Sequence, residues 1–201
     1  MRVDTPGTGD VMYGRTHLQP AGGRSFTDRL IGIARLDRSA FEEVEHDRNA
    51  TSQAAIVILV AAVAAAIGQV DEGGRGLIAG LIGGLLAWVV SSAFIYVAGT
   101  RVIPSDRVEA TVGQVLRTQG FAAAPNLLLV VAAFPLFGGL VAFAVGIWYL
   151  ITRIVAIQAA LETSVLRAIG IAIVAVILEF VVLGVMGLIF GVGLFAVGAV
   201  L

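Results

Sequence analysis

The sequence predicts an all-α fold: a polytopic transmembrane helical bundle of five spans, preceded by cytoplasmic amphipathic helices. Two observations predict it. Of the 201 residues, 58% are apolar and only 13% are charged, which leaves too little polar surface for a soluble domain. Apolar stretches of about 20 residues, the length of a helix that crosses a bilayer, also recur towards the C-terminus. We therefore divide the chain into a tail (1–25), amphipathic helices (26–50) and a transmembrane domain (51–201).

The polar N-terminal region begins with the tail, which is rich in Gly and is expected to be flexible and cytoplasmic. A helical stripe of apolar side chains then predicts a first amphipathic helix on the membrane surface, and it comprises Phe26, Leu30, Ile33 and Ala34. Neighbouring arginines are candidates to hold lipid phosphates, or to orient the first span by their charge alone; they are Arg24, Arg29, Arg35 and Arg38.

A second short helix should follow, because Ser39 and Glu42 fit the capping-box pattern in which both side chains satisfy free amides at a helix start. We expect its acidic residues to form a solvated outer face; they are Glu42, Glu43, Glu45 and Asp47. A metal site that combines these acids with His46 is not expected, because neighbours in sequence point in several directions around a helix.

The first two spans are predicted over about 52–70 and 76–98, and their short connection makes them a hairpin. The more polar residues 99–118 have apolar positions at helical spacing, which favours another interfacial helix. The third span, about 120–134, would rise only about 23 Å as a straight α-helix. We therefore expect it to recruit residues on either side.

The fourth span is predicted over about 140–157, and the last apolar stretch over 165–201. As one straight helix, that last stretch would extend about 55 Å, well past a hydrocarbon core of about 30 Å. We expect a fifth span followed by a bent or interfacial extension near Gly184. A sixth span over 184–201 is the alternative.

Arginine placement predicts the orientation. The region before the first span and the loops after the second and fourth spans carry nearly all of the arginines, whereas the opposite side carries only Arg75. The positive-inside rule then places the N-terminus in the cytoplasm of a multi-pass protein of the plasma (inner) membrane. With five spans, the C-terminus lies outside.

Glu179 lies in an otherwise apolar helix, where a charged carboxylate is costly unless it is paired, hydrated or protonated. The spans offer Asn126, Ser91 and Ser92 as partners, whereas we expect Arg153 to lie too near the cytoplasmic surface to reach it. Two interpretations stay open. Glu179 is either a carboxyl group that fixes helix packing or a proton or cation site.

Small residues at intervals of four predict close helix packing, either within one chain or between copies. They are Gly76, Gly80 and Gly84 in the second span, and Gly187 and Gly191 near the C-terminus.

Four short motifs carry a resemblance to a known family. They are the run Phe41-Glu-Glu-Val-Glu-His-Asp, the pair Gly99-Thr100, the run Gly120-Phe-Ala-Ala-Ala-Pro125 and the run Gly146-Ile-Trp148. Over about residues 26–183 the chain resembles bacterial members of the Yip1 domain family. The resemblance implies five transmembrane helices and a cytoplasmic N-terminus. Eukaryotic relatives are linked to Rab GTPases and vesicle traffic, but a chain that resembles the bacterial members has no obvious Rab to bind. The resemblance therefore implies a fold rather than an activity.

Catalysis is not expected, because both histidines, His17 and His46, lie outside the spans and the sequence contains no HExxH motif and no P-loop. We expect no cofactor, no metal and no nucleic-acid partner. The predicted function is that of a non-enzymatic scaffold, interaction protein or accessory subunit, with membrane lipids and either a protein partner or a second copy as its contacts. The alternative is a transporter or channel that uses Glu179.

Overall fold

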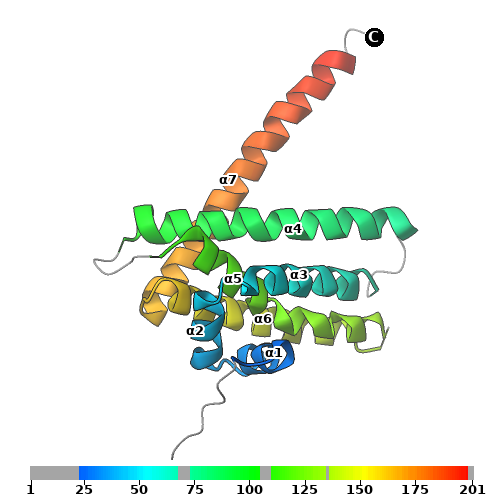
Figure 1. The fold of residues 1–201 in the computed structure, drawn as a ribbon. Helices are drawn as coiled ribbons and strands as arrows, with labels where there is room; N and C mark the ends of the chain where they lie inside the picture. The colour runs from blue at the N-terminus through cyan, green and yellow to red at the C-terminus, as the bar shows by residue number, and fades with distance from the viewer. Residues whose placement is uncertain (1–22, 68–72, 105–109, 135, 199–201) are drawn as a thin grey trace, which may run out of the picture.

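A computed structural model describes residues 23–67, 73–104, 110–134 and 136–198 (Figure 1). All of its regular elements there are helical: α1 (Phe26–Ala34), α2 (Arg38–His46), α3 (Ala50–Ile67), α4 (Gly73–Val97), η2 (Ala98–Val102), α5 (Val112–Ala122), η3 (Ala124–Ala133), α6 (Gly138–Ala160) and α7 (Val165–Gly198). Five segments are long and apolar enough to cross a membrane: Ala50–Ile67, Gly80–Val102, Val112–Ala133, Gly138–Ala160 and Val165–Val185. The predicted all-α fold, with five spans preceded by short helices, is confirmed. Most of the predicted tail lies outside the described residues.

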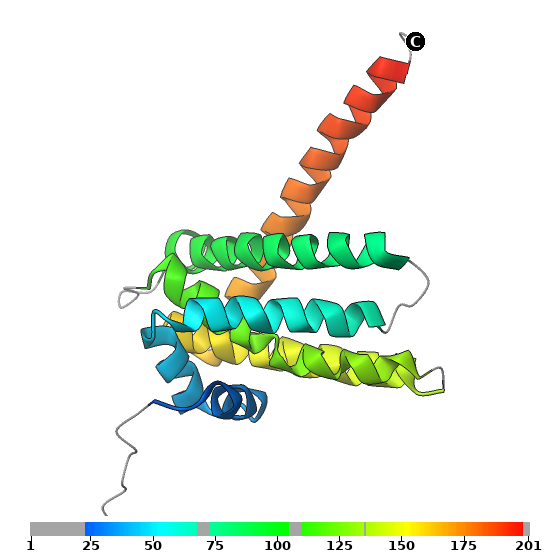
Figure 2. The same cartoon turned by 45° about the vertical axis from the view of Figure 1, so that its right-hand side comes forward.

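The apolar stripe of α1 faces the protein, which corrects the prediction of a helix that uses this stripe to lie on the membrane surface. Ile33 is fully buried, and the ring of Phe26 packs edge-on against Phe121 of α5 with 6.0 Å between ring centroids. The indole Nε1 of Trp148 on α6 donates a hydrogen bond to the oxygen of Ala34 at 2.9 Å. Figure 2 shows α1 beside α6. The stripe thus buries apolar area against the spans.

The turn between α1 and α2 also differs from its prediction. Leu36 has a φ of 63°, and the amide of Asp37 donates to the oxygen of Gly32 at 2.9 Å, which is the hydrogen bond that closes a Schellman motif. The carboxylate of Asp37 then accepts from the amide of Ser39 at 3.0 Å. Because Asp37 occupies the N-cap, α2 begins before Ser39, and the predicted capping box at Ser39 and Glu42 is wrong.

The third span combines two kinds of helix. α5 begins with a capping box between Thr111 and Gln114, and η3 continues it as a 3-10 helix with Pro125 in its first turn. A 3-10 helix rises about 2.0 Å per residue, against 1.5 Å in an α-helix, so η3 reaches farther than the same residues would in α5. The span was predicted to recruit residues on either side; it recruits the preceding residues from Val112 but ends at Ala133. The second half of the predicted interfacial helix is therefore the beginning of this span.

Two glycines allow the spans to approach closely. A Cβ atom on Gly120 of α5 would lie 2.6 Å from the Cβ of Ala54 on α3 and 3.0 Å from Nε1 of Trp88 on α4. At the π-helical end of α4, a Cβ atom on Gly99 would lie 2.5 Å from a methyl carbon of Leu161, which follows α6. Both glycines belong to motifs of the family resemblance, and at both positions the absence of a side chain lets a neighbouring side chain approach the backbone.

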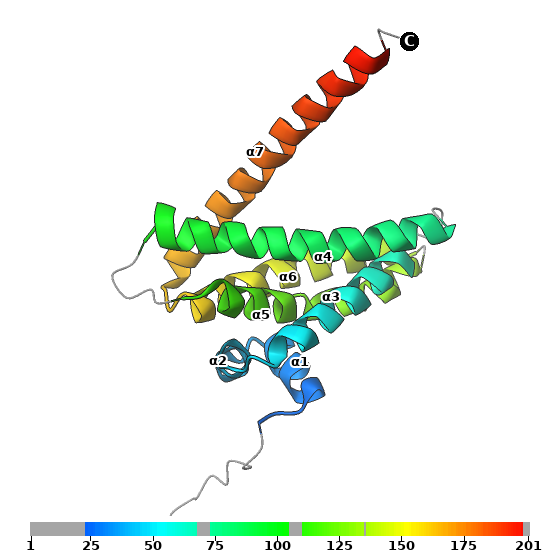
Figure 3. The same ribbon diagram turned by 45° about the horizontal axis from the view of Figure 1, so that its top comes forward.

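α7 is one continuous helix of 34 residues, so the predicted bent extension is not observed, and neither is a separate sixth span before Gly198. An unbroken helix satisfies its own amides in lipid, whereas a turn there would leave them unpaired. Figures 1 and 3 show α7 crossing α4 obliquely and then leaving the bundle. Among the residues of α7 whose burial is described, Ala168, Ile171 and Ala175 belong to the core, and all three lie in its first part.

Candidate functional site

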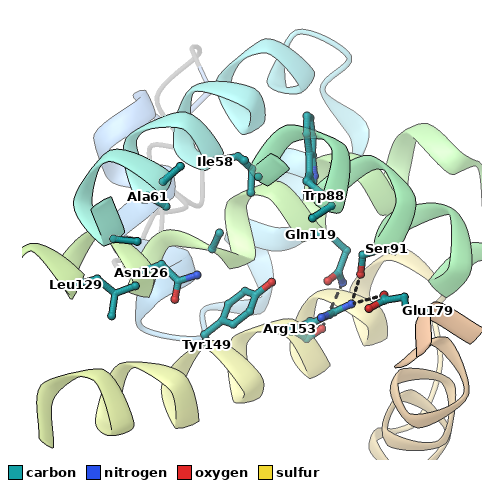
Figure 4. A pocket seen from close by; sticks show the side chains of 15 residues that line it. Ile58, Ala61, Trp88, Ser91, Gln119, Asn126, Leu129, Tyr149, Arg153 and Glu179 are labelled. Carbon is teal, nitrogen blue, oxygen red and sulfur yellow. Dashed lines mark hydrogen bonds and ion pairs between the residues drawn. The ribbon is translucent and has the colours of Figure 1, made fainter. Parts of the chain in front are cut away.

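A cavity of about 300 Å³ lies between the spans, and all five of them line it (Figure 4). α3 contributes apolar side chains, including Ile58 and Ala61, and Leu129 of η3 adds another. Polar side chains come from the other elements: Ser91 from α4, Gln119 from α5, Asn126 from η3, Tyr149 and Arg153 from α6, and Glu179 from α7. Such a mixed lining is typical of ligand pockets, and its volume lies at the lower end of their usual range.

An ion pair in the cavity joins Arg153 to Glu179. Nη2 of Arg153 lies 3.4 Å from Oε1 of Glu179 and also donates a hydrogen bond to the hydroxyl of Ser91. The prediction that Arg153 cannot reach Glu179 is therefore wrong. That prediction took the position of a residue along its helix as a measure of its depth in the membrane. This measure compares two helices correctly only when they have the same tilt. α7 is inclined to α6 (Figure 3), so Arg153 and Glu179 meet although they lie at different distances along the chain from the turn between the two helices.

Three of the four predicted polar residues come together here, and one does not. Ser91, Asn126 and Glu179 line the cavity. Ser92 is fully buried away from it, and its hydroxyl has no hydrogen-bond partner among the described residues. Sequence reasoning missed Gln119, whose amide donates to the backbone oxygen of Arg153 at 3.4 Å. A polar side chain at helical spacing within an apolar span was the signal that could have found it.

Side chains of the third span hold α2 in place. Nε of Arg117 on α5 donates to the backbone oxygens of Val44 and Glu45 at 3.2 and 3.1 Å, and Nη2 donates to Glu45 as well. These oxygens belong to the last turn of α2, where a helix leaves carbonyls unpaired and where its dipole favours a cation. Gln114 also donates to the carboxylate of Glu45 at 2.8 Å. α2 is thus fixed to the third span.

Two of the four arginines proposed for lipid phosphates are used inside the protein. Arg29 is 6% exposed and forms ion pairs with Glu43 at 3.0 Å and Asp47 at 2.7 Å. Burial alone would lower the pKa of Arg29, but its hydrogen bonds and charge pairs with the two carboxylates raise it overall. Arg24 pairs with Asp37 at 3.0 Å. Arg35 and Arg38 are exposed and stay available to lipid.

The acidic residues of α2 do not form one solvated face, which corrects that prediction. Glu45 is only 3% exposed, and burial raises the pKa of its carboxyl group. The hydrogen bond from Arg29 lowers the pKa of Asp47. Glu42 is exposed as predicted. Glu43 and Asp47 therefore connect α2 to α1, and Glu45 connects it to the third span.

The predicted glycine contacts are observed in part. A Cβ atom on Gly84 would lie 3.6 Å from the Cβ of Ala62, which fits close packing of α4 on α3. Gly80 has no neighbour within 4 Å of its Cβ position among the described residues, so it does not take part in that contact. The surroundings of Gly76, Gly187 and Gly191 lie outside the part that the structure describes in side-chain detail.

Comparison with known proteins gives one family match. A family model described as the Yip1 domain matches residues 31–200, which is most of the chain. Searches of curated proteins and of solved structures found no match.

Proposed function

Because this chain belongs to the Yip1 domain family, whose members are generally non-enzymatic membrane proteins, we propose that it works as a scaffold or interaction protein of the plasma membrane. The N-terminus and the α1–α2 pair then lie in the cytoplasm and the C-terminus lies outside, as the arginine distribution favours. It contacts either another membrane protein or a second copy of itself. No cofactor, metal or nucleic acid takes part.

The observation that carries this proposal is an uncovered segment of α7. Phe180, Val181, Val182 and Leu183 are consecutive in the helix and are all exposed, between 42% and 71%. Because successive residues of an α-helix point about 100° apart, four in a row cover every side of it. This chain therefore leaves the helix uncovered over these four residues. In lipid, such a helix gains dispersion contacts by packing on another helix, and small residues permit the closest approach.

A pair of glycine substitutions tests the role of α7. Gly184 on α7 and Gly146 on α6 both have open space around their Cβ positions, so leucine at either site fits the isolated chain. Gly184→Leu should reduce the proteins, or the second copies, that co-purify in mild detergent, because leucine holds a neighbouring helix away. Gly146→Leu is the matched control and should retain them, as mass spectrometry of the purified material would show. Equal recovery with both variants would contradict assembly through α7.

The second candidate is a transporter or channel, which the polar cavity beside Glu179 favours. Against it, the carboxylate of Glu179 already pairs with Arg153 at 3.4 Å. Proteoliposomes that contain the wild-type chain or Glu179→Gln would separate the two functions. The scaffold proposal predicts the same proton and cation leak for both. A flux that the wild type supports and the variant loses would establish transport instead.

A further inference from the structure

The cavity between the spans has more hydrogen-bonding capacity than its own residues use. Nη2 of Arg153 serves Ser91 and one oxygen of Glu179. Within the part of the chain that the structure describes, the hydroxyl of Tyr149 and the side-chain amide of Asn126 have no hydrogen-bond partner, although both line the cavity. Unpaired polar groups in a membrane interior are costly. A polar guest would therefore stabilise the site.

The charges of the cavity specify the chemistry of that guest. One cation, Arg153, and one anion, Glu179, lie side by side at its polar end (Figure 4). A guest with a single charge would pair with one of these two residues and either repel the other or leave its charge unpaired. Both outcomes are unfavourable away from water. A guest that carries an anion and a cation close together satisfies both residues.

The shape and lining of the cavity point to the membrane as the source. Its volume of about 300 Å³ suits a head group rather than a complete lipid. Ile58 and Leu129 make part of the lining apolar, and Ala87 of α4 both lines the cavity and is exposed on the side of the bundle. α7 leaves the bundle after it crosses α4 (Figure 1), and Phe180, the residue after Glu179, is 71% exposed. A head group can enter here while its acyl chains stay in lipid.

We propose that this cavity binds the head group of an aminophospholipid of the phosphatidylethanolamine type. The phosphate accepts hydrogen bonds from the Arg153 guanidinium, and the primary ammonium donates to Glu179. Tyr149 and Asn126 lie within the same cavity and provide hydrogen bonds to the remaining phosphate oxygens. A primary ammonium carries three donors, whereas the trimethylammonium of a choline lipid has none for the carboxylate. A glycerol head group offers no cation at all.

Native mass spectrometry of the purified full chain tests this selectivity. The probes are phosphatidylethanolamine, phosphatidylglycerol and phosphatidylcholine with identical acyl chains at equal concentration. Since a charge-assisted hydrogen bond corresponds to roughly a tenfold change in affinity or more, we expect the ethanolamine lipid to bind about tenfold more tightly than either of the others. Equal retention of the glycerol or choline lipid by the wild type would overturn the proposal.

Two variants and one soluble compound complete the experiment. Arg153→Gln/Glu179→Gln removes both charges, so no lone charge is left in the spans to unfold the protein, and it should lose the ethanolamine preference. Arg101→Gln, at the exposed end of the second span, is the matched control and should keep it. A double variant that still prefers the ethanolamine lipid as the wild type does would contradict the proposal. O-phosphoethanolamine should compete only weakly, because it lacks acyl chains; binding as tight as that of the lipid would assign the site to a free aminoalkyl phosphate and overturn the lipid proposal.

Discussion

At the scale of single residues, buried charge explains how the α1–α2 pair is held. Arg117 is the clearest case, because it serves the C-terminal carbonyls of α2 from within the third span. The sequence predicted Arg117 only as one of the arginines that orient the protein. Its second role depends on α2 folding back onto α5, and no local pattern in either segment signals that contact. Glu179 could be identified from the sequence because it is the one acid in an apolar helix. Its contact with Arg153 could not be predicted, because it depends on the tilt of α7.

Replacement of Arg117 tests this contact. Arg117→Met keeps the apolar stem and removes the hydrogen bonds to Val44 and Glu45. We expect a loss of about 2–3 kcal/mol in the docking of α2, because backbone oxygens lose a charged donor. Limited proteolysis in detergent should then release the N-terminal helices faster than in wild type. Arg101→Met, on an exposed arginine, serves as the control. Identical cleavage of Arg117→Met and wild type would show that Arg117 does not hold α2.

The raised pKa of Glu45 predicts a pH dependence of stability. Burial raises this pKa above its ordinary value of 4.5, so the folded state favours the neutral carboxyl group. The contribution of this neutral carboxyl group to the free energy of unfolding is fully present below pH 4.5 and is lost as pH rises through the pKa of the folded state. Glu45→Gln should therefore match the wild-type melting temperature near pH 4 and exceed it increasingly towards about pH 7. Glu42→Gln, on the exposed side of α2, should show no such trend in thermal melts. A constant difference for Glu45→Gln would contradict the assignment.

At the scale of the elements, the ends of helices were harder to predict than their existence. The spans could be found from the sequence because bilayer thickness fixes their length. The 3-10 geometry of η3 could not, since the only local signal was Pro125, and the choice between hydrogen-bond patterns depends on neighbouring helices. The α1–α2 turn was misplaced because Leu36 adopts a left-handed conformation that glycine usually provides.

The turn between α6 and α7 allows a direct test of this helix-end geometry. Glu162 has a φ of 43°, and the amide of Thr163 donates to the oxygen of Gln158 at 3.2 Å, as in a Schellman motif. Glu162→Gly and Glu162→Ala both remove the charge, but only glycine relieves the contact of Cβ with the backbone. We expect the glycine variant to be more stable than the alanine variant by about 1 kcal/mol. Equal thermal stability of the two in detergent would show that this conformation carries no strain.

At the scale of the whole molecule, the protein consists of five spans, an α1–α2 pair packed at their ends and a last helix that diverges from the bundle. The number of spans could be predicted from the apolar composition of the chain and from the length of each apolar stretch. The packing of the amphipathic stripe at Ile33 against the spans did not, because the same stripe would also suit a membrane surface. The oblique path of α7 depended on contacts such as Ile171 with its neighbours in the core, which lie far apart in sequence. Glu179 on this path lines the cavity, and the residues Phe180 to Leu183 that follow it are exposed.

Cysteine labelling tests the central claim, which is that α1 and α2 cap the cytoplasmic ends of an odd number of spans. The chain has no cysteine, so single sites can be introduced cleanly at Arg48, Gly139 and Ser164, which lie at the beginnings of the first, fourth and fifth spans. A maleimide that cannot cross the membrane should label Gly139→Cys in intact cells. It should label Arg48→Cys and Ser164→Cys only after the inner membrane is made permeable. Labelling of Arg48→Cys from outside, or of all three sites from one side, would contradict the account.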